Sequence, residues 1–343
     1  MHVIFSPKHR QHAPPVEFVR SGLGPYSESP NRADSILAAL ESATDGFDIS
    51  EPVEHASAVL EAVHDVDYLD FLERVHAVWR DTAPTADQGI IPLTFAARSL
   101  DTRPADLVSQ AGYYCFDAQT PIVAGTYVAA RAAADTALTG ADRLLCGDPA
   151  AYALCRPPGH HAAGAMYGGY CYLNNAALAA AYLLERGKSP VAVLDIDYHH
   201  GNGTQEIFYH TDKVLTLSIH GDPNHAYPHY CGYASESGTG AGAGANINIP
   251  LPPRVDDEHY LRILADSLDR VRAFSPAALV LALGVDTCID DPLGDFDLSL
   301  DAFSHIGKAV ASLKLPTLAV QEGGYAIGAG AQAVLNVLNA LRQ

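Results

Sequence analysis

The sequence is poor in basic residues. It contains 21 lysines and arginines against 40 aspartates and glutamates, so its formal net charge is −19 at pH 7. This balance argues against a nucleic acid partner, because binding to phosphates needs a basic face. An acidic surface suits the steering of a small cationic substrate, although it equally suits solubility or a salty habitat.

Paired cysteines and long apolar runs are also missing. The six cysteines include no CxxC pair and form no dense framework, so we expect reduced, mostly buried thiols in a cytoplasmic protein. No apolar run reaches the roughly 18 residues that span a bilayer, and the N-terminus leads straight into an expected strand without a signal peptide. We therefore expect a cytoplasmic localisation and no membrane partner.

The remaining composition indicates one large α/β domain. The 343 residues are 48% hydrophobic, show no repeats and contain no low-complexity linker, so we expect a single domain over residues 1–343. Apolar runs alternate with helical patterns, which predicts a mostly parallel central sheet with helices on both faces. The expected strands are residues 2–5, 151–155, 191–196, 214–219, 277–283 and 316–320. The expected helices are residues 30–43 (with Asn31 as N-cap), 67–80, 122–138, 174–186, 256–274, 301–313 and 331–341.

Two segments have no clear element. Residues 232–246 read as a glycine-rich loop, and residues 81–119 contain scattered prolines and few periodic apolar positions. A loop as long as the second one is uncommon inside a compact domain and is usually functional or an interface.

The most informative stretch is VAVLDIDYHHGNGTQ, residues 191–205. A buried strand here runs into Asp195, Asp197 and His199, and the two-residue period of an extended chain places these three on one side. The carboxyl end of a strand in an open α/β sheet is where ligands bind. An aspartate and a histidine there, with one more carboxylate from elsewhere, would hold a divalent metal and leave room for water.

Four other expected strands also end in chemically active side chains. Each of these side chains taken alone has an ordinary structural explanation, such as a loop anchor or a buried hydrogen-bonded group. In a parallel sheet, however, all five strand ends meet at one edge, and this conjunction predicts a catalytic site. The side chains are His160 and His161, Asp197 and His199, His220, Asp286, and Tyr325; His220 receives no assigned role.

These residues lie in four blocks that resemble the signatures of the zinc-dependent histone deacetylase superfamily, which has the arginase/deacetylase fold. The blocks are RPPGHHA (156–162), DIDYHHGNGTQ (195–205), GVDT (284–287) and EGGY (322–325). In detail the chain most resembles the bacterial acetylpolyamine amidohydrolases, through VIFS at its start, SQAGYYC (109–115) and GAGAG (240–244).

The resemblance implies a role for each catalytic residue. One zinc ion would be held by Asp197, His199 and Asp286, with a position open for water and the substrate carbonyl. His161 would be the general base and then the acid for the leaving amine. His160 would pair with Asp195, and Tyr325 would donate its hydroxyl to the carbonyl oxygen. Asn202 stands where class I deacetylases have an aspartate facing the general base, so we expect a lower pKa for His161.

The resemblance also implies ion and substrate contacts. A structural potassium ion would be bound by Asp195, Ser218 and the backbone of Ile219 (with the backbone of Asp197 and His199), and a second could lie near Phe208, Thr211 and Val214. Tyr170, following Gly169, and Tyr227 would form the walls of a substrate tunnel. Glu17 fits an acidic position at its mouth, whereas Val108, Gln119 and Leu293 are uncharged where relatives carry acids, with Asp106 and Asp117 nearby.

The expected function is removal of acetyl or other acyl groups from small N-acetylated amines such as acetylputrescine, acetylcadaverine or acetylspermidine. The loop at about 81–120 would pack against a second subunit, which implies a homodimer. Alternatives are a deacetylase of acetyl-lysine in proteins, a hydrolase of another small amide, a binding protein that senses acetylated ligands, and an arginase-type binuclear manganese hydrolase. The last needs more Asp and His ligands than the chain offers here.

Overall fold

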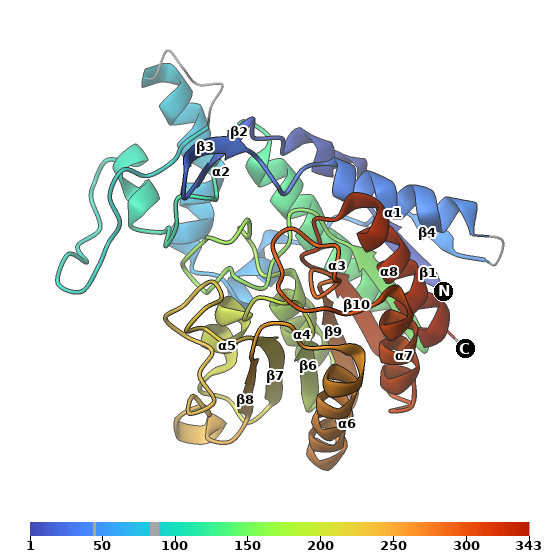
Figure 1. Cartoon of the computed structure of the whole chain (residues 1–343). Coiled ribbons are helices and arrows are strands. Elements are labelled where there is room, and N and C mark those ends of the chain that lie inside the picture. Colours follow the sequence, from blue (N-terminus) through green and yellow to red (C-terminus); the bar gives the residue numbers. More distant parts are fainter. Residues whose placement is uncertain (44–45, 83–88, 343) are drawn as a thin grey trace.

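A sheet of eight parallel strands forms the centre of the chain in a computed structural model, which describes residues 1–43, 46–82 and 89–342 (Figure 1). The strands lie in the order β4-β1-β5-β10-β9-β6-β7-β8. Their bounds are β1 His2–Phe5, β4 Asp48–Ser50, β5 Ala150–Leu154, β6 Val191–Asp195, β7 Val214–Gly221, β8 Asn246–Leu251, β9 Ala278–Leu283 and β10 Thr317–Gln321. The predicted parallel sheet is confirmed.

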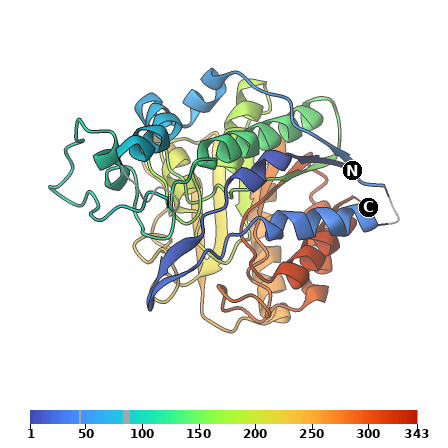
Figure 2. The same ribbon diagram turned by 90° about the horizontal axis from the view of Figure 1, so that it is seen from above.

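Two helical layers cover the two faces of this sheet, as Figure 2 shows from above. One layer contains α1 (Asn31–Ser42), α6 (Asp257–Phe274), α7 (Leu300–Ala311) and α8 (Ile327–Leu341). The other contains α2 (Val66–Thr82), α3 (Thr126–Leu145), α4 (Asn175–Glu185) and α5 (Asn202–Phe208). Successive strand residues point to opposite faces, so that Val193 packs in one core and Leu194 in the other. Both faces are buried, which explains the near-continuous apolar strands.

Smaller elements lie around these layers. Strands β2 (Val16–Val19) and β3 (Gly22–Pro25) form an antiparallel hairpin, and the 3₁₀ helices are η1 (Pro7–Gln11), η2 (Ser57–Ala62), η4 (Val108–Gly112) and η5 (Gly240–Gly242). The segment from residue 89 to η4 projects from the body of the molecule (Figure 1). It is the described part of the long loop predicted at 81–119; residues 83–88 lie outside the described residues, and residues 81 and 82 extend α2.

The prediction of several element ends was wrong. Helix α1 begins at Asn31, so Pro30 and not Asn31 is its N-cap. Helix α3 begins at Thr126 instead of 122, because Ile122 forms a bridge with Ile90. It also continues beyond 138 through Gly140, where an added Cβ would lie 2.6 Å from a methyl carbon of Leu318 on β10. This glycine allows close packing of helix on sheet and does not end the helix.

Four strands were missed for a common reason. Strands β2, β3, β4 and β8 are short or lie at edges, and each contains polar residues, glycine or proline that interrupt an apolar run. Strand β8, NINIPL, follows directly from the predicted glycine-rich loop, and Pro250 is tolerated there because β8 is the last strand of the sheet.

The amino edge of the sheet lies opposite the edge that the motifs predict to be active. Met1 and Arg342 line one hollow there, together with Pro149 and Ala150 at the start of β5. Within the described ranges, no helix combines the length and the apolar content that crossing a bilayer requires.

Candidate active site

The carboxyl ends of the strands enclose a cavity of about 230 Å³. Loops that follow β5, β6, β7 and β10 contribute to it, because in a parallel sheet all these ends lie at one edge. Its lining includes His161, Gly169, Tyr170, His199, Tyr227, Leu293 and Tyr325, together with Gln119, Tyr198, His225 and Ala226. The structure therefore brings most of the predicted catalytic and substrate-binding residues to one place.

A potential metal-binding group lies at the base of this cavity. Ligand atoms of Asp197, His199 and Asp286 all fall within 4.8 Å of one another. Nδ1 of His199 is 2.9 Å from Oδ2 of Asp286 and 3.3 Å from Oδ1 of Asp197. Both carboxylates are fully buried, and backbone amides orient them: the Tyr198 N–H donates to Asp286 (2.7 Å) and the Gly323 N–H donates to Asp197 (2.8 Å).

The electrostatics of this group fit a divalent cation. Burial and the neighbouring Asp197 carboxylate raise the pKa of Asp286 to about 7. Two buried carboxylates beside one imidazole are costly unless a positive charge compensates them. One imidazole nitrogen and two carboxylate oxygens are donors that a divalent cation such as zinc accepts in proteins.

Two adjacent histidines lie beside the metal group with opposite electrostatics. Nδ1 of His160 bonds Oδ2 of Asp195 at 2.9 Å. Burial lowers the pKa of His160, but the carboxylates of Asp197 and Asp195 outweigh it and raise the value to about 10. The pKa of His161 lies well below its usual range because of burial and then the charges of His160 and His199. At neutral pH His160 is therefore charged, and His161 is neutral and able to accept a proton.

Asn202 faces the second of these histidines, as the sequence predicted. Its Oδ1 lies 2.7 Å from Nδ1 of His161. The amide oxygen accepts a hydrogen bond from the protonated Nδ1, so Nε2 carries no proton and is the basic atom. Because an amide carries no charge, it stabilises the protonated imidazole less than a carboxylate would.

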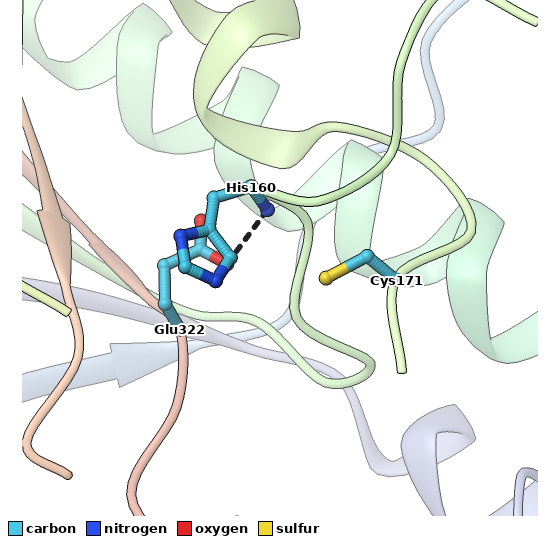
Figure 3. A group of neighbouring side chains, drawn as sticks. All are labelled: His160, Cys171 and Glu322. Atoms are coloured by element: carbon cyan, nitrogen blue, oxygen red, sulfur yellow. Dashed lines mark hydrogen bonds between the residues drawn. The ribbon is translucent and has the colours of Figure 1, made fainter. Parts of the chain in front are cut away.

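Glu322 supports the histidine pair and was not assigned a role from the sequence. Its Oε2 accepts the backbone N–H groups of Gly159 (2.6 Å) and His160 (3.0 Å; Figure 3). Burial raises the pKa of Glu322 to about 7. Its place in the EGGY block was the only available signal.

Cys171 points toward the same pair (Figure 3), and His160, Cys171 and Glu322 form a second compact group of potential ligands. Each of the three side chains already has a hydrogen-bond partner in the protein. His160 bonds Asp195, and Glu322 accepts hydrogen bonds from two backbone N–H groups. The Cys171 thiol donates to the Gly169 carbonyl at 3.3 Å. These bonds identify the group as a support for His160.

Tyr325 is held over the cavity by its backbone and by its ring. Asp291 accepts the N–H groups of Tyr325 (2.6 Å) and Ala326 (3.0 Å). The guanidinium of Arg32 lies 4.7 Å from the Tyr325 ring centroid and donates to the Glu322 carbonyl at 2.6 Å. Sequence reasoning missed both Asp291 and Arg32 because neither belongs to the four blocks.

The two predicted tunnel walls are present. The Tyr170 ring lies 5.8 Å from that of Tyr325, and the Tyr227 ring lies edge-on to His161 at 5.1 Å. Gly169 is required between them, because its φ is +55° and an added Cβ would lie 2.2 Å from Cδ2 of His161. A side chain at position 169 would therefore collide with the His161 ring.

The predicted acidic mouth differs from the structure. Glu17 is 1% exposed and accepts a hydrogen bond from the Ser27 hydroxyl (2.6 Å). It is not among the residues that line the active-site cavity. Val108 begins η4 and lines a different hollow, whereas Leu293 and Gln119 are at the cavity. The Asp106 carboxylate accepts hydrogen bonds from the N–H and the hydroxyl of Ser109. Among the described residues that line the cavity there is no carboxylate.

The predicted potassium ligands lie beneath the metal group. Asp195 and Ser218 are paired across β6 and β7 and line a small cavity of about 10 Å³, and Ile219 follows on β7. Phe208, Thr211 and Val214 lie from the end of α5 to the start of β7. His220 bonds Ser218 (2.8 Å) and the Gly232 carbonyl (2.9 Å), so it is a satisfied buried residue.

With this geometry in place, comparison with known proteins gives the class. The histone deacetylase domain matches residues 26–341, so the chain belongs to the histone deacetylase family. A solved structure of the HDA15 HD domain superposes with a TM-score of 0.80 at 28% identity, covering 99% of this chain and 90% of that one.

More similar relatives define the branch. Acetylpolyamine amidohydrolase 1 of Pseudomonas aeruginosa is 44% identical over 98% of this chain and 97% of its own. Acetylpolyamine amidohydrolase of Mycoplana ramosa is 43% identical over 100% and 99%. The crystal structure of the acetylpolyamine aminohydrolase from Burkholderia pseudomallei has a TM-score of 0.93 at 39% identity, covering 99% and 98%. The chain is thus a hydrolase that acts on amide bonds other than peptide bonds.

Proposed function

We propose that the protein is a zinc-dependent amidohydrolase that removes acetyl or related acyl groups from small N-acetylated amines, including acetylpolyamines. The observation that carries this proposal is the convergence of Asp197, His199 and Asp286 with a neutral His161 and the Tyr325 ring at one cavity. The names of the relatives, acetylpolyamine amidohydrolases, support the substrate class.

The three ligands Asp197, His199 and Asp286 would hold the zinc ion. When bound, zinc supplies Lewis-acid polarisation of the carbonyl and a more acidic water. His161 accepts a proton from the attacking water at Nε2, because Nδ1 is engaged by Asn202. It then returns this proton to the nitrogen of the leaving amine. Acetate and the free amine are the products.

The other residues stabilise charge during this reaction. The Tyr325 hydroxyl donates a hydrogen bond to the carbonyl oxygen as negative charge develops on it. His160, hydrogen-bonded to Asp195, lies beside the reacting atoms and would add positive potential there. Tyr170 and Tyr227 enclose the alkyl chain of the amine and exclude water from the reacting amide.

The proposal includes the assembly and the bound ions. One domain spans residues 1–343, and the loop at about 81–120, part of which projects from the body (Figure 1), packs against a second subunit in a cytoplasmic homodimer. A structural potassium ion at Asp195, Ser218 and Ile219 would stiffen the loop that carries Asp197 and His199.

The test is a steady-state screen of the purified, zinc-loaded protein. The panel contains acetylputrescine, acetylcadaverine, acetylspermidine, an acetyl-lysine peptide and a neutral N-alkylacetamide. We expect the acetylated amines to have a kcat/KM at least about tenfold above that of the peptide. A preference for the peptide would instead establish a protein deacetylase, and no turnover of any amide would overturn the proposal.

A further inference from the structure

We propose that Asp291 is a positioning residue for the reaction. Its carboxylate fixes the peptide unit that precedes the Tyr325 side chain, and it thereby sets where the tyrosine hydroxyl meets the substrate carbonyl. This inference rests on the proposed function and adds to it a residue that does not itself line the cavity.

The Tyr325 side chain depends on its backbone for its position. Its hydroxyl has no hydrogen-bond partner among the described residues, and its ring has the Arg32 guanidinium at 4.7 Å and the Tyr170 ring at 5.8 Å. Gly323 and Gly324 precede it, and Gly324 has a φ of +128°, which favours glycine. Since neither glycine has a side chain to pack, polar contacts must hold this loop in one conformation.

The peptide unit between Gly324 and Tyr325 is held on both sides. Nε of Arg32 donates to the Gly324 carbonyl, and Oδ2 of Asp291 accepts the Tyr325 N–H at 2.6 Å. The carbonyl and the N–H belong to one rigid plane, so the two contacts together fix its rotation. This plane also contains the Cα of Tyr325. If the contact with Asp291 is lost, the plane can turn about the flexible Gly324, which displaces the hydroxyl at the far end of the side chain.

Asp291 ties the same loop to the start of helix α8. The N-cap of this helix is Ala326, and its side chain makes no capping hydrogen bond. Oδ2 of Asp291 accepts the Ala326 N–H at 3.0 Å from a position 35 residues earlier in the chain. The positive end of the helix dipole favours a carboxylate at this place. Asp291 therefore supplies the cap that α8 lacks, and it joins the tyrosine to a helix of 15 residues.

The second oxygen of Asp291 holds a wall of the cavity. Its Oδ1 accepts the N–H of Leu293 at 3.0 Å, and Leu293 lines the cavity. The carboxylate is 7% exposed, so water competes little for its two oxygens. A shift of the wall affects substrate binding and thus KM, whereas a shift of the tyrosine hydroxyl affects the transition state and thus kcat. The two contributions are therefore separable.

The test is a double-mutant cycle of Asp291→Ala and Tyr325→Phe, with Asp257→Ala as the matched control. Asp257 likewise accepts the N–H of a helix N-cap distant in the chain, that of Ser299 on α7, at 2.8 Å. Neither Asp257 nor Ser299 lines the cavity. The measured quantities are kcat and KM for acetylcadaverine with the zinc-loaded proteins.

We expect Asp291→Ala to lower kcat about 10–100-fold in the wild type, because misplacing an oxyanion donor costs much of its effect. In the Tyr325→Phe protein the same substitution should lower kcat less than about threefold, since the hydroxyl that it positions is already absent. Asp257→Ala should change kcat less than about twofold. The same fold loss in both backgrounds would make Asp291 merely structural, and an unchanged kcat would show that it does not position the tyrosine; either result overturns the inference.

A second measurement does not depend on turnover. With 3-fluorotyrosine in place of Tyr325, the ¹⁹F NMR spectrum reports how many positions this ring occupies. We expect one sharp resonance in the otherwise wild-type protein and with Asp257→Ala, and a broadened or second resonance with Asp291→Ala. An unchanged single resonance would overturn the inference.

Asp291→Ser replaces the alanine variant in both measurements if that variant does not fold. Its hydroxyl lies one bond nearer to the backbone than a carboxylate oxygen, so it falls short of the Tyr325 N–H while leaving a polar group in place. If the wild type hydrolyses no acetylated amine, the proposed function fails, whereas the ¹⁹F spectrum still decides whether Asp291 positions Tyr325.

Discussion

At the carboxyl edge of the sheet, two neighbouring histidines have opposite pKa shifts. His160 and His161 are adjacent, with ring centroids 4.0 Å apart, yet their surroundings move their pKa values in opposite directions. Burial lowers both values, but the carboxylates of Asp197 and Asp195 outweigh it at His160, whereas at His161 the charges of His160 and His199 lower the pKa further. Neighbouring groups of unlike charge are the usual way in which one site contains both a proton acceptor and a fixed cation.

Removing either reacting side chain should abolish most turnover without unfolding the protein. We expect His161→Ala and Tyr325→Phe to lower kcat by about 10²–10³, because each removes a group that acts on the reacting atoms. Circular dichroism and zinc content should match the wild type. Tyr230→Phe is the control, since Tyr230 is 93% exposed and does not line the cavity. Near-normal activity of either active-site variant would show that its role is assigned wrongly.

The amide partner of His161 predicts a specific pH dependence. Asn202→Asp places a carboxylate against Nδ1 of His161 and should raise the pKa of this histidine. Since the base must be neutral to act, the acidic limb of the profile of kcat/KM against pH should move to higher pH by about one unit or more. A profile that moves to lower pH, or does not move, would contradict His161 as the base.

At the scale of elements, the sequence predicted the strands that are buried on both faces and most of the helices that cover them, but it missed the seven-residue helix α5. Long apolar runs and helical periods carry this information. Short or edge strands such as β4 and β8 carry little of it, because they are only partly buried and alternate apolar with polar residues. Helix α3 runs on past the predicted end at 138, and Gly140 lies within it against Leu318, a neighbour from a strand distant in the sequence.

The catalytic blocks were predictable because each follows a strand in a local pattern. Asp291 and Arg32 were not, since each contacts a residue that is far away in the chain. The separation in sequence is what hides such contacts from local patterns.

Among the helix N-caps, we expect the loss of Asn174, the N-cap of α4, to lower the stability of the fold most. Asn174 is fully buried, accepts the Ala177 N–H (2.9 Å), and donates to the Ala162 carbonyl (2.9 Å) and the Thr204 hydroxyl (3.1 Å). We expect Asn174→Ala to lower the free energy of unfolding by about 2–4 kcal/mol. Asp256→Ala removes the exposed N-cap of α6 and should cost about 1 kcal/mol. Chemical denaturation measures both, and equal losses would contradict this account.

At the scale of the whole molecule, the fold concentrates buried carboxylates at one edge of an already acidic protein. The net charge of −19 is spread over the chain, but Asp195, Asp197, Asp286 and Glu322 are all buried near one another. Such an arrangement is stable only if cations or protons compensate it.

Removal of the metal should therefore make stability depend on pH. Without a cation, the pKa of Asp286 is raised to about 7, so between roughly pH 4 and 7 the folded chain holds a proton that the unfolded chain has released. Stability of the chelated protein then falls as pH rises through this window. The pKa of His199, raised to about 10, extends the fall in the same direction at higher pH.

Thermal unfolding at pH 6 and pH 8 measures this effect. The chelated protein should have the lower Tm at pH 8, and added zinc should restore stability most at that pH. A chelated protein that is more stable at pH 8 would contradict the arrangement.

The projecting loop provides a test of assembly. Leu93 and Leu100 are 96% and 75% exposed there, which is costly unless another surface covers them. The double substitution Leu93→Asp and Leu100→Asp should convert a dimer into a monomer in sedimentation experiments. Val53→Asp, at an exposed valine outside this loop, is the control. A wild type that sediments as a monomer would contradict the dimer proposal.

The two ends of the described chain meet at the amino edge of the sheet, where Met1 and Arg342 line the same hollow. An affinity handle or a surface tether attached at either end would leave the cavity mouth facing outward. A short peptide joining these ends would also allow new ends to be opened elsewhere, so the enzyme offers a natural starting point for circular permutation and for immobilised biocatalysis.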